Sequence, residues 1–207
     1  MPWLVTAALL AGTGTVAGAM ATRHRFVQGL DDRLEAIVGP HRSRFHRIAS
    51  IVTLPGEWFA HPVIGTVVVT VLLIARGGPA TRFVLPLAVA SLGAIAAHHA
   101  VKFVYRRARP EVALRRDKTE AAYPSGHTTN TTAVLATSAF LLVREGVVPV
   151  YVAVPCVAAI ALATGTSRVV LGWHWSSDVV GGWFTGVAVA AMCSAWYEAL
   201  SAASGPA

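Results

Sequence analysis

Residues 167–178, Ser-Arg-Val-Val-Leu-Gly-Trp-His-Trp-Ser-Ser-Asp, place a cation, an imidazole and a carboxylate at fixed spacing beside a membrane-length apolar segment. If the residues after Trp173 are helical, His174 and Asp178 are four apart and share a face. Asp178 can then accept a hydrogen bond from one imidazole nitrogen and leave the other free as a nucleophile. In the alternative interpretation, Asp178 complements the helix dipole in a first turn and His174 is an interfacial residue by chance.

Two cations, Lys102 and Arg109, end another apolar segment and are seven residues apart. This spacing is close to two helical turns, so both side chains project the same way, and Pro110 then helps to end the helix. Lys as a point charge and Arg as a bidentate fork suit a phosphate group. The alternative is a juxtamembrane basic cluster that anchors to lipid, which is the role we expect for Arg106 and Arg107.

A Tyr-Pro-Ser-Gly-His run at residues 123–127 opens a further apolar segment. Gly126 allows backbone to come close to a ligand, and the N–H groups at a helix start form an anion site. Ser125 can donate its hydroxyl to a phosphate oxygen, and His127 can protonate a leaving oxygen. The alternative makes Ser125 an N-cap and His127 an interfacial residue.

The composition predicts an integral membrane protein. Of the 207 residues, 55% are hydrophobic and only 13% are charged, against about 25% charged in soluble domains. The net charge is +7, but the basic residues lie between apolar runs and no separate polar domain carries a nucleic-acid footprint. Phosphate groups and anionic lipid are therefore the expected counter-charges, and nucleic acid is not an expected partner.

Cysteine usage and motif content predict one domain over residues 1–207. Cys156 and Cys193 lie inside apolar segments and are interpreted as packing residues. No Cys/His pattern has zinc-site spacing, and the sequence has no glycine-rich nucleotide loop, no internal repeat and no low-complexity linker.

The hydropathy pattern predicts an all-α bundle of six transmembrane helices. The first apolar run is followed, not preceded, by positive charges, so it is interpreted as a retained span and not a signal peptide. Residues 22–58 predict two short amphipathic helices divided at Gly39-Pro40, lying along the membrane surface or packed on the bundle. The polar connections 105–127 and 167–177 then fall on the same side. The predicted spans are about residues 3–21, 59–75, 83–104, 128–143, 147–166 and 178–196.

Three motifs together resemble a known family. They are Lys102-x6-Arg109-Pro110, Pro124-Ser-Gly-His127 and Ser167-Arg168-x5-His174-x3-Asp178. In order and gaps they are similar to the three-part signature of the type 2 phosphatidic acid phosphatase superfamily, with every signature position matched. The six-span layout resembles the membrane lipid-phosphatase branch over essentially the whole chain. Soluble bacterial acid phosphatases and vanadium haloperoxidases share the signature, but the predicted spans argue against both.

The resemblance implies a role for each motif residue. His174 would attack phosphorus in line and form a phosphohistidine, with Asp178 holding its tautomer. His127 would give a proton to the departing oxygen and then activate water. No metal or cofactor is expected, because three fixed cations can neutralise the phosphoryl group. The residues implied to hold the phosphoryl oxygens are Lys102, Arg109, Arg168, Ser125 and the Gly126 amide.

Side chains next to these motifs are interpreted more simply. His98, one turn before Lys102, is assigned either to the pocket or to bundle packing. Aromatic residues are expected at membrane interfaces, which explains Trp173 and Trp175. Tyr123 has the same explanation, although it could also shape a lipid entrance.

Charge distribution predicts a multi-pass protein of the cell membrane with its active site in the cytoplasm. Only Arg76, Arg82 and Arg144 fall on the far side, so the motif side carries the other 14 of the 17 basic residues. Many bacterial members of the family instead face the periplasm. The expected substrate is phosphatidic acid, phosphatidylglycerophosphate, polyprenyl pyrophosphate or a polyprenyl-linked sugar phosphate. The alternatives are a phosphotransferase with the same intermediate, and a catalytically silent protein that binds anionic lipid.

Overall fold

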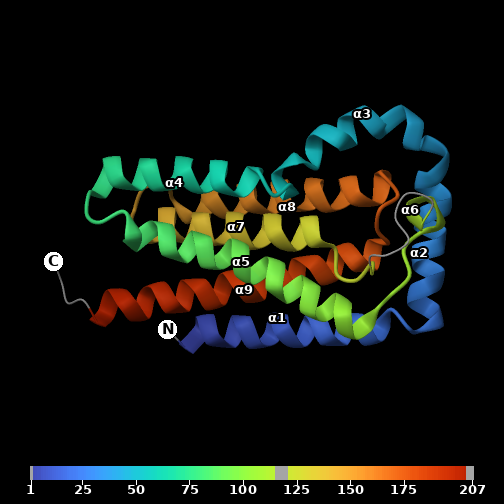
Figure 1. Ribbon diagram of the computed structural model, residues 1–207, viewed down its shortest axis with the longest axis horizontal. Helices are drawn as coiled ribbons and strands as arrows, with labels where there is room; N and C mark the ends of the chain where they lie inside the picture. Colours follow the sequence, from blue (N-terminus) through green and yellow to red (C-terminus); the bar gives the residue numbers. More distant parts are fainter. Residues whose placement is uncertain (1, 115–120, 204–207) are drawn as a thin grey trace.

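The computed structural model describes residues 2–114 and 121–203, and within these ranges the chain is helical with no strand. Arg115, Arg116 and Lys118, which the charge count placed on the motif side, lie outside the described residues. The long helices run side by side along the longest axis (Figure 1). They are α1 (Pro2–Ala21), α4 (Ala60–Arg76), α5 (Thr81–Tyr105), α7 (Gly126–Arg144), α8 (Val150–Val170) and α9 (Ser176–Ala203).

Among the described residues, four helices are long and apolar enough to cross a membrane: α1, α5, α8 and α9. Helix α4 is apolar but has only 17 residues. Helix α7 has 19 residues but opens with a polar run, in which Thr128, Thr129 and Thr131 are fully buried. By length and composition, the structure therefore supports four of the six predicted spans. Helix α4 is too short for this criterion, and α7 is too polar for it because its polar side chains face the interior of the bundle.

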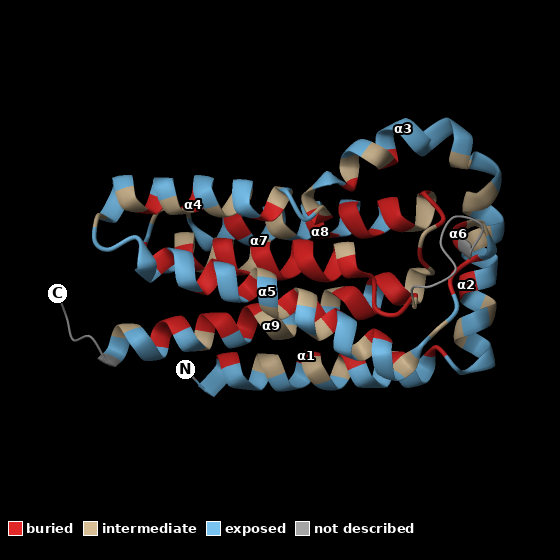
Figure 2. Ribbon diagram, viewed as in Figure 1, coloured by how far each residue is buried: buried red, intermediate tan, exposed pale blue. Residues whose placement is uncertain are grey.

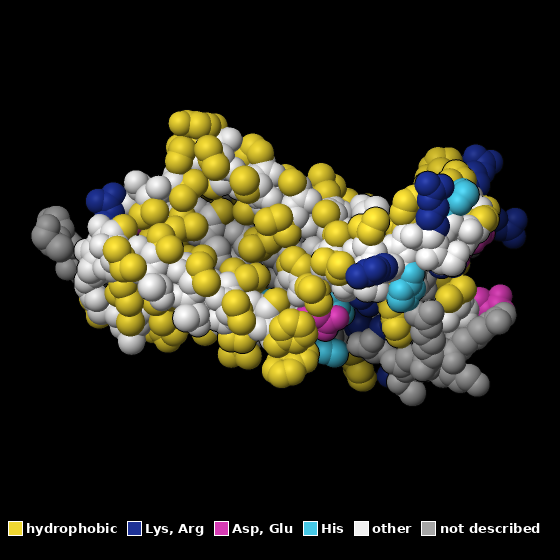
Figure 3. Space-filling view, turned by 90° about the horizontal axis from the view of Figure 1, so that it is seen from above, with side chains coloured by type: hydrophobic (Ala, Val, Ile, Leu, Met, Phe, Trp, Pro, Cys, Tyr) yellow, Lys and Arg dark blue, Asp and Glu magenta, His cyan; other side chains and the backbone are white. Residues whose placement is uncertain are grey.

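The bundle has the burial pattern of a multi-pass membrane protein. Buried residues face the interior around α7, whereas the outer faces of α1, α4 and α8 are exposed (Figure 2). The exposed surface along the bundle is largely hydrophobic, and charged side chains gather toward one end (Figure 3). Leu10, Ile74 and Tyr151 are examples of large apolar side chains that point outward. Apolar surface of this extent requires lipid around it.

Two amphipathic helices connect α1 to α4, and the break between them lies where the sequence predicted it. Helix α2 (Arg25–Val38) is followed by the short turn η1 (Gly39–His41), helix α3 (Arg42–Val52) and the turn η2 (Leu54–Gly56). Helix α2 runs across the end of the bundle (Figure 1). Its apolar side chains are exposed, while Asp31 on the opposite face is 3% exposed. The helix therefore directs one face outward and one polar residue inward.

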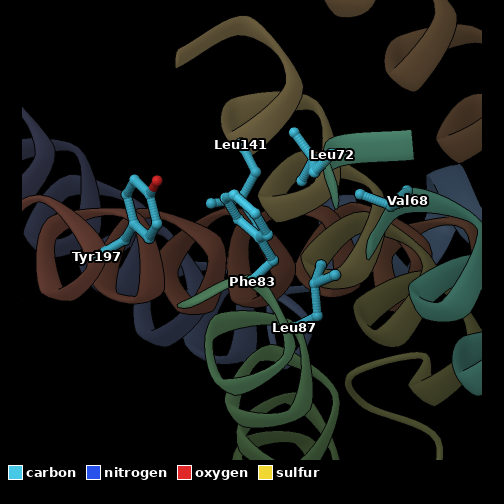
Figure 4. Packing of buried hydrophobic residues seen from close by; sticks show 6 residues of the cluster. All are labelled: Val68, Leu72, Phe83, Leu87, Leu141 and Tyr197. Carbon is cyan, nitrogen blue, oxygen red and sulfur yellow. The ribbon is translucent and has the colours of Figure 1, made fainter. Parts of the chain in front are cut away.

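A hydrophobic cluster closes the end of the bundle away from the three motifs (Figure 4). Its side chains come from four helices: Val68 and Leu72 of α4, Phe83 and Leu87 of α5, Leu141 of α7, and Tyr197 of α9. Two ion pairs lie at the same end, Arg82 with Glu145 at 2.8 Å and Arg144 with Glu198 at 2.7 Å. This end is therefore closed by packing and ion pairs.

Close contact between α7 and α9 fixes the relative position of two motifs. A Cβ atom added at Gly182 would lie 2.9 Å from the carbonyl oxygen of Ser125, and one at Gly186 would lie 2.7 Å from that of Thr129. Only glycine allows this approach of α9 to the backbone of α7. The Ser125 N–H also donates to the Asp178 carbonyl at 2.9 Å. The start of α7 is thereby joined to the start of α9.

Candidate active site

The three motif segments lie at the same end of the bundle. They follow α5, open α7, and join α8 to α9 (Figure 1). Helices that alternate in direction necessarily place these three connections together. Residues that are up to 76 positions apart, from Lys102 to Asp178, therefore surround one site.

His174 lies in the short connection between α8 and α9, and its ring faces Asp178. The Nδ1 atom of His174 is 3.6 Å from Oδ2 of Asp178, and the two residues are 2% and 0% exposed. This is an ion-pair distance but longer than a hydrogen bond. The same Oδ2 accepts from the Trp175 N–H at 2.9 Å. Asp178 thus lies on the Nδ1 side of the ring and leaves the Nε2 side for a reacting atom.

The surroundings of His174 strongly favour its neutral form. Burial lowers the pKa of its imidazole well below the ordinary value, and the charges of Arg168, Arg109 and Lys102 lower this pKa further. His127 also contributes to the electrostatic field at His174. A neutral imidazole surrounded by cations has the protonation state that a nucleophile needs.

The three cations are all nearly buried: Lys102, Arg109 and Arg168 are 6%, 5% and 7% exposed. The indole of Trp173 contacts both guanidinium groups, with its ring centre 5.6 Å from Cζ of Arg109 and 5.7 Å from Cζ of Arg168. The Nη1 atom of Arg168 also donates to Oγ1 of Thr53 at 3.1 Å. Trp173 was interpreted from the sequence as an interfacial residue, and its contacts show instead that it organises the arginines.

Ser125 and Gly126 are positioned by contacts with neighbouring helices. Ser125 precedes α7 and is fully buried, and its hydroxyl makes no capping bond but accepts from Oγ1 of Thr128 at 3.0 Å. A Cβ atom at Gly126 would lie 3.1 Å from Cε1 of His98. His98 therefore packs against the start of α7, which accounts for its burial in the bundle.

His127 has a carboxylate partner that sequence analysis missed. Its Nε2 atom is 3.0 Å from Oε1 of Glu57, the residue that follows η2. The preceding Gly56 lies against His127, since a Cβ there would be 2.7 Å from the Cβ of His127. No motif contains Glu57, and its distance of 70 positions from His127 leaves no signal in a single sequence.

Comparison with known proteins identifies the family. The sequence model of the PAP2 superfamily matches residues 83–202 of the 207-residue chain. The chain belongs to the PAP2 superfamily. A solved structure of a transmembrane PAP2-type phosphatidylglycerolphosphate phosphatase from Bacillus subtilis superposes on this PAP2 protein with a TM-score of 0.79, covering 93% of this chain and 96% of that chain. At 22% identity this likeness concerns the fold. Comparison with curated proteins gave no significant match.

The contacts of Arg107 in this PAP2 protein correct its sequence-based interpretation as a lipid anchor. Its Nη1 atom donates to Oδ1 of Asp178 at 2.6 Å and its Nη2 atom to Oδ2 of Asp31 at 2.7 Å. Its side chain is 15% exposed. Two inward carboxylates, and not lipid phosphates, are therefore its counter-charges. The exposed neighbour Arg106, whose guanidinium lies 5.1 Å from the centre of the Phe103 ring, remains suited to the surface.

Asp31 was also missed, because it lies in an amphipathic helix with many charged residues. It accepts hydrogen bonds from Oγ of Ser176 at 2.6 Å and from the Ser177 N–H at 3.0 Å, in addition to the bond from Arg107. Burial alone would raise the pKa of Asp31, but hydrogen bonds from Arg107, Ser176 and Ser177 hold this pKa below its ordinary value. A charged Asp31 thus ties α2 to the first turn of α9.

Two aromatic residues of the PAP2 protein have structural contacts that the sequence did not predict. Tyr123 is fully buried and its hydroxyl donates to the Thr15 carbonyl at 2.7 Å, so it packs α1 against the site and does not shape a lipid entrance. The Nε1 atom of Trp175 donates to the Ala108 carbonyl at 3.1 Å.

Within the described ranges, no group of three or more His, Cys, Asp or Glu residues is arranged to hold a metal ion.

Proposed function

We propose that the protein is a membrane phosphatase that hydrolyses a phosphate or pyrophosphate monoester of a lipid through a phosphohistidine. The observation that carries the proposal is a buried His174 whose Nδ1 faces Asp178, on which the charges of the buried cations Lys102, Arg109 and Arg168 act. A phosphoryl group bound by three cations would present its phosphorus to the free nitrogen of this imidazole. Membership of the PAP2 superfamily supports the same chemistry.

In the first step, Nε2 of His174 attacks phosphorus in line with the ester bond. The N–P bond forms as the P–O bond breaks, and His127 transfers a proton to the departing oxygen. Asp178 stabilises the imidazolium character that His174 gains, while the cations hold the charge on the phosphoryl oxygens. The Ser125 hydroxyl and the Gly126 N–H contribute further hydrogen bonds.

In the second step, His127 acts as the base. It removes a proton from water, whose oxygen attacks phosphorus, and the N–P bond breaks to release inorganic phosphate and restore His174. The three cations neutralise the phosphoryl charge that a divalent metal would otherwise neutralise, so the proposed reaction is independent of metal.

The substrate would reach the site from within the bilayer. We propose that α4 and α7 cross the membrane together with α1, α5, α8 and α9, which makes six spans. Support comes from α7, whose polar residues are buried inside the bundle and need not meet lipid. Such an approach suits all four candidate substrates: phosphatidic acid, phosphatidylglycerophosphate, polyprenyl pyrophosphate and polyprenyl-linked sugar phosphates.

The main experiment measures phosphate release from these lipid phosphates by the purified full chain in detergent micelles, with and without EDTA. We expect release that EDTA does not reduce, and loss of release in His174→Ala. A His174→Ala variant as fast as the parent would exclude the proposed nucleophile. Loss of activity in EDTA with recovery on adding a divalent ion would contradict the metal-free reaction. Equal yields of inorganic phosphate and of the lipid product that has lost one phosphate indicate hydrolysis, whereas a deficit of inorganic phosphate indicates transfer to an acceptor.

We further propose that the protein resides in the cell membrane with its active site in the cytoplasm, as the distribution of basic residues favours. After replacement of Cys156 and Cys193, single cysteines at the exposed Ser43 and Thr81 mark the two ends of the bundle. In intact cells, an impermeant thiol reagent should label Thr81→Cys and spare Ser43→Cys. The reverse pattern would place the active site outside.

A further inference from the structure

Glu57 places a negative charge beside the residue that serves the leaving group. Its Oε1 atom is 3.0 Å from Nε2 of His127, the proposed acid for the departing oxygen. Any oxygen that hydrogen-bonds the same imidazole lies within about 8 Å of this carboxylate. Its side chain is 31% exposed, so a substrate can reach it.

The exposed side chains that follow Glu57 indicate where the lipid part of a substrate lies. Trp58 and Phe59 come next in the chain and are 77% and 45% exposed. In a lipid monoester, the leaving alcohol carries the apolar chains, and these would pack against such aromatic side chains. In Figure 3, acidic and histidine side chains are exposed together where the hydrophobic surface of the bundle meets its charged end. The leaving group and Glu57 would thus occupy the same side of the site.

The charges of the site are therefore divided between two halves. Lys102, Arg109 and Arg168 surround the nucleophile His174 and suit the phosphoryl group that is transferred. The leaving-group half carries the carboxylate of Glu57. His127 lies next to both halves, because Arg168 and Lys102 as well as Glu57 interact electrostatically with it.

This division distinguishes two classes of lipid phosphate. Attack on the terminal phosphorus of a diphosphate leaves the second phosphate in the leaving group, where its charge would face Glu57 within a poorly screened site. A monophosphate leaves a neutral alcohol, and a hydroxyl on that alcohol could donate to the carboxylate. We propose that Glu57 makes the site selective for lipids that carry a single phosphate and disfavours diphosphates. This inference rests on the proposed function and narrows its substrate class.

The test compares kcat/KM for phosphatidic acid and farnesyl diphosphate in the same micelles, for the full-length parent and for Glu57→Gln. The parent should prefer phosphatidic acid. Removal of the charge should raise kcat/KM for the diphosphate by about tenfold or more, whereas Glu57→Asp, which keeps the charge, should retain the preference. Glu198→Gln makes the same chemical change at the opposite end of the bundle and should leave both values unchanged.

The outcome depends on the absolute kcat/KM of Glu57→Gln for farnesyl diphosphate. If Glu57 only orients His127, the Gln variant will lose activity on phosphatidic acid without gaining any on farnesyl diphosphate, and the inference is wrong. A parent that already prefers the diphosphate would also overturn it while leaving the phosphatase proposal intact. A parent that releases phosphate from neither lipid, nor from the other lipid phosphates named above, would instead refute the proposed function itself. If Glu57→Gln does not fold, Glu57→Ala removes the same charge, and an unchanged kcat/KM for farnesyl diphosphate in that variant would likewise overturn the inference.

Discussion

The Nη1 atom of Arg107 lies 2.6 Å from Oδ1 of Asp178, and its other terminal nitrogen lies 2.7 Å from Asp31. Asp178 is fully buried, so this guanidinium is a counter-charge that water cannot replace. The carboxylate proposed to orient the nucleophile is therefore itself held by Arg107, which lies just after α5, and through Arg107 it is linked to the surface helix α2. Arg107 thus holds together α2, the start of α9 and the segment that follows α5.

Replacement of Arg107 by Ala is expected to leave two buried carboxylates without their guanidinium partner. Breaking a buried ion pair in this way costs about 3–5 kcal/mol, and displacement of Asp178 should lower kcat by about a hundredfold. Thermal unfolding in detergent and phosphate release measure the two effects. Arg106→Ala removes the same charge from the exposed neighbouring position and should change stability by no more than about 0.5 kcal/mol. Equal behaviour of the two variants would restore the lipid-anchor interpretation.

Asp31→Asn tests whether α2 supports the connection between α8 and α9, which contains His174. The amide cannot accept all the hydrogen bonds that Ser176, Ser177 and Arg107 direct to the carboxylate, so we expect a loss of about 1–3 kcal/mol in the free energy of unfolding. The activity should fall mainly in kcat, because the cations proposed to bind the phosphoryl group are untouched. The exposed neighbour Asp32 provides the control, since Asp32→Asn should behave like the parent. A parental melting temperature in Asp31→Asn would refute the tie between α2 and α9.

The pH dependence of kcat/KM should report the surroundings of His174. Because burial and three cations lower the pKa of this imidazole well below 6.5, it stays neutral until the pH falls well below that value. The acid limb of the profile should therefore lie below pH 6.5. Lys102→Gln removes one of the lowering charges and should move the limb upward. A parental limb at or above pH 6.5 would contradict the assignment.

The same pKa shift predicts a contribution to stability. Below pH 6.5 the unfolded chain protonates His174 while the folded chain does not, so the folded state loses stability as the pH falls from 6.5 toward the lowered pKa. His174→Gln should remove this contribution. Unfolding followed between pH 7 and pH 5 in detergent, for the parent and the variant, measures the difference in slope.

Trp173 is expected to act through the two arginines that flank it. Each cation–π contact is worth about 0.5–1 kcal/mol, so Trp173→Ala should reduce kcat/KM by about five- to thirtyfold, and Trp173→Phe by less. The exposed Trp3, at the other end of the bundle, is the matched control, and Trp3→Ala should retain parental activity. A Trp173→Ala variant that loses only membrane association would support the earlier interfacial interpretation.

The amino-acid sequence by itself determined the helices and the family. Hydropathy runs predicted the bounds of the long helices to within four residues, except that α9 continues seven residues past its predicted end. Gly39-Pro40 predicted the break between α2 and α3, because such features depend on local composition and backbone constraints. The family prediction was confirmed by the match over residues 83–202. The candidate catalytic residues could be proposed from the spacings of the three motifs. The expectation that Lys102 and Arg109 project from one helix was wrong, because α5 ends at Tyr105 and Arg106 adopts a left-handed conformation.

The tertiary structure decided which other polar residues contact the candidate catalytic residues. Glu57, Asp31 and Arg107 reach the site from just after η2, from α2 and from just after α5, and their partners lie between 70 and 146 positions away along the chain. No local pattern distinguishes them from ordinary surface charges. Their roles arise from burial and from opposite charges in close contact, and these depend on how the helices pack against one another. For the same reason the burial of Thr128, Thr129 and Thr131 in α7 could not be predicted, because their neighbours lie on other helices.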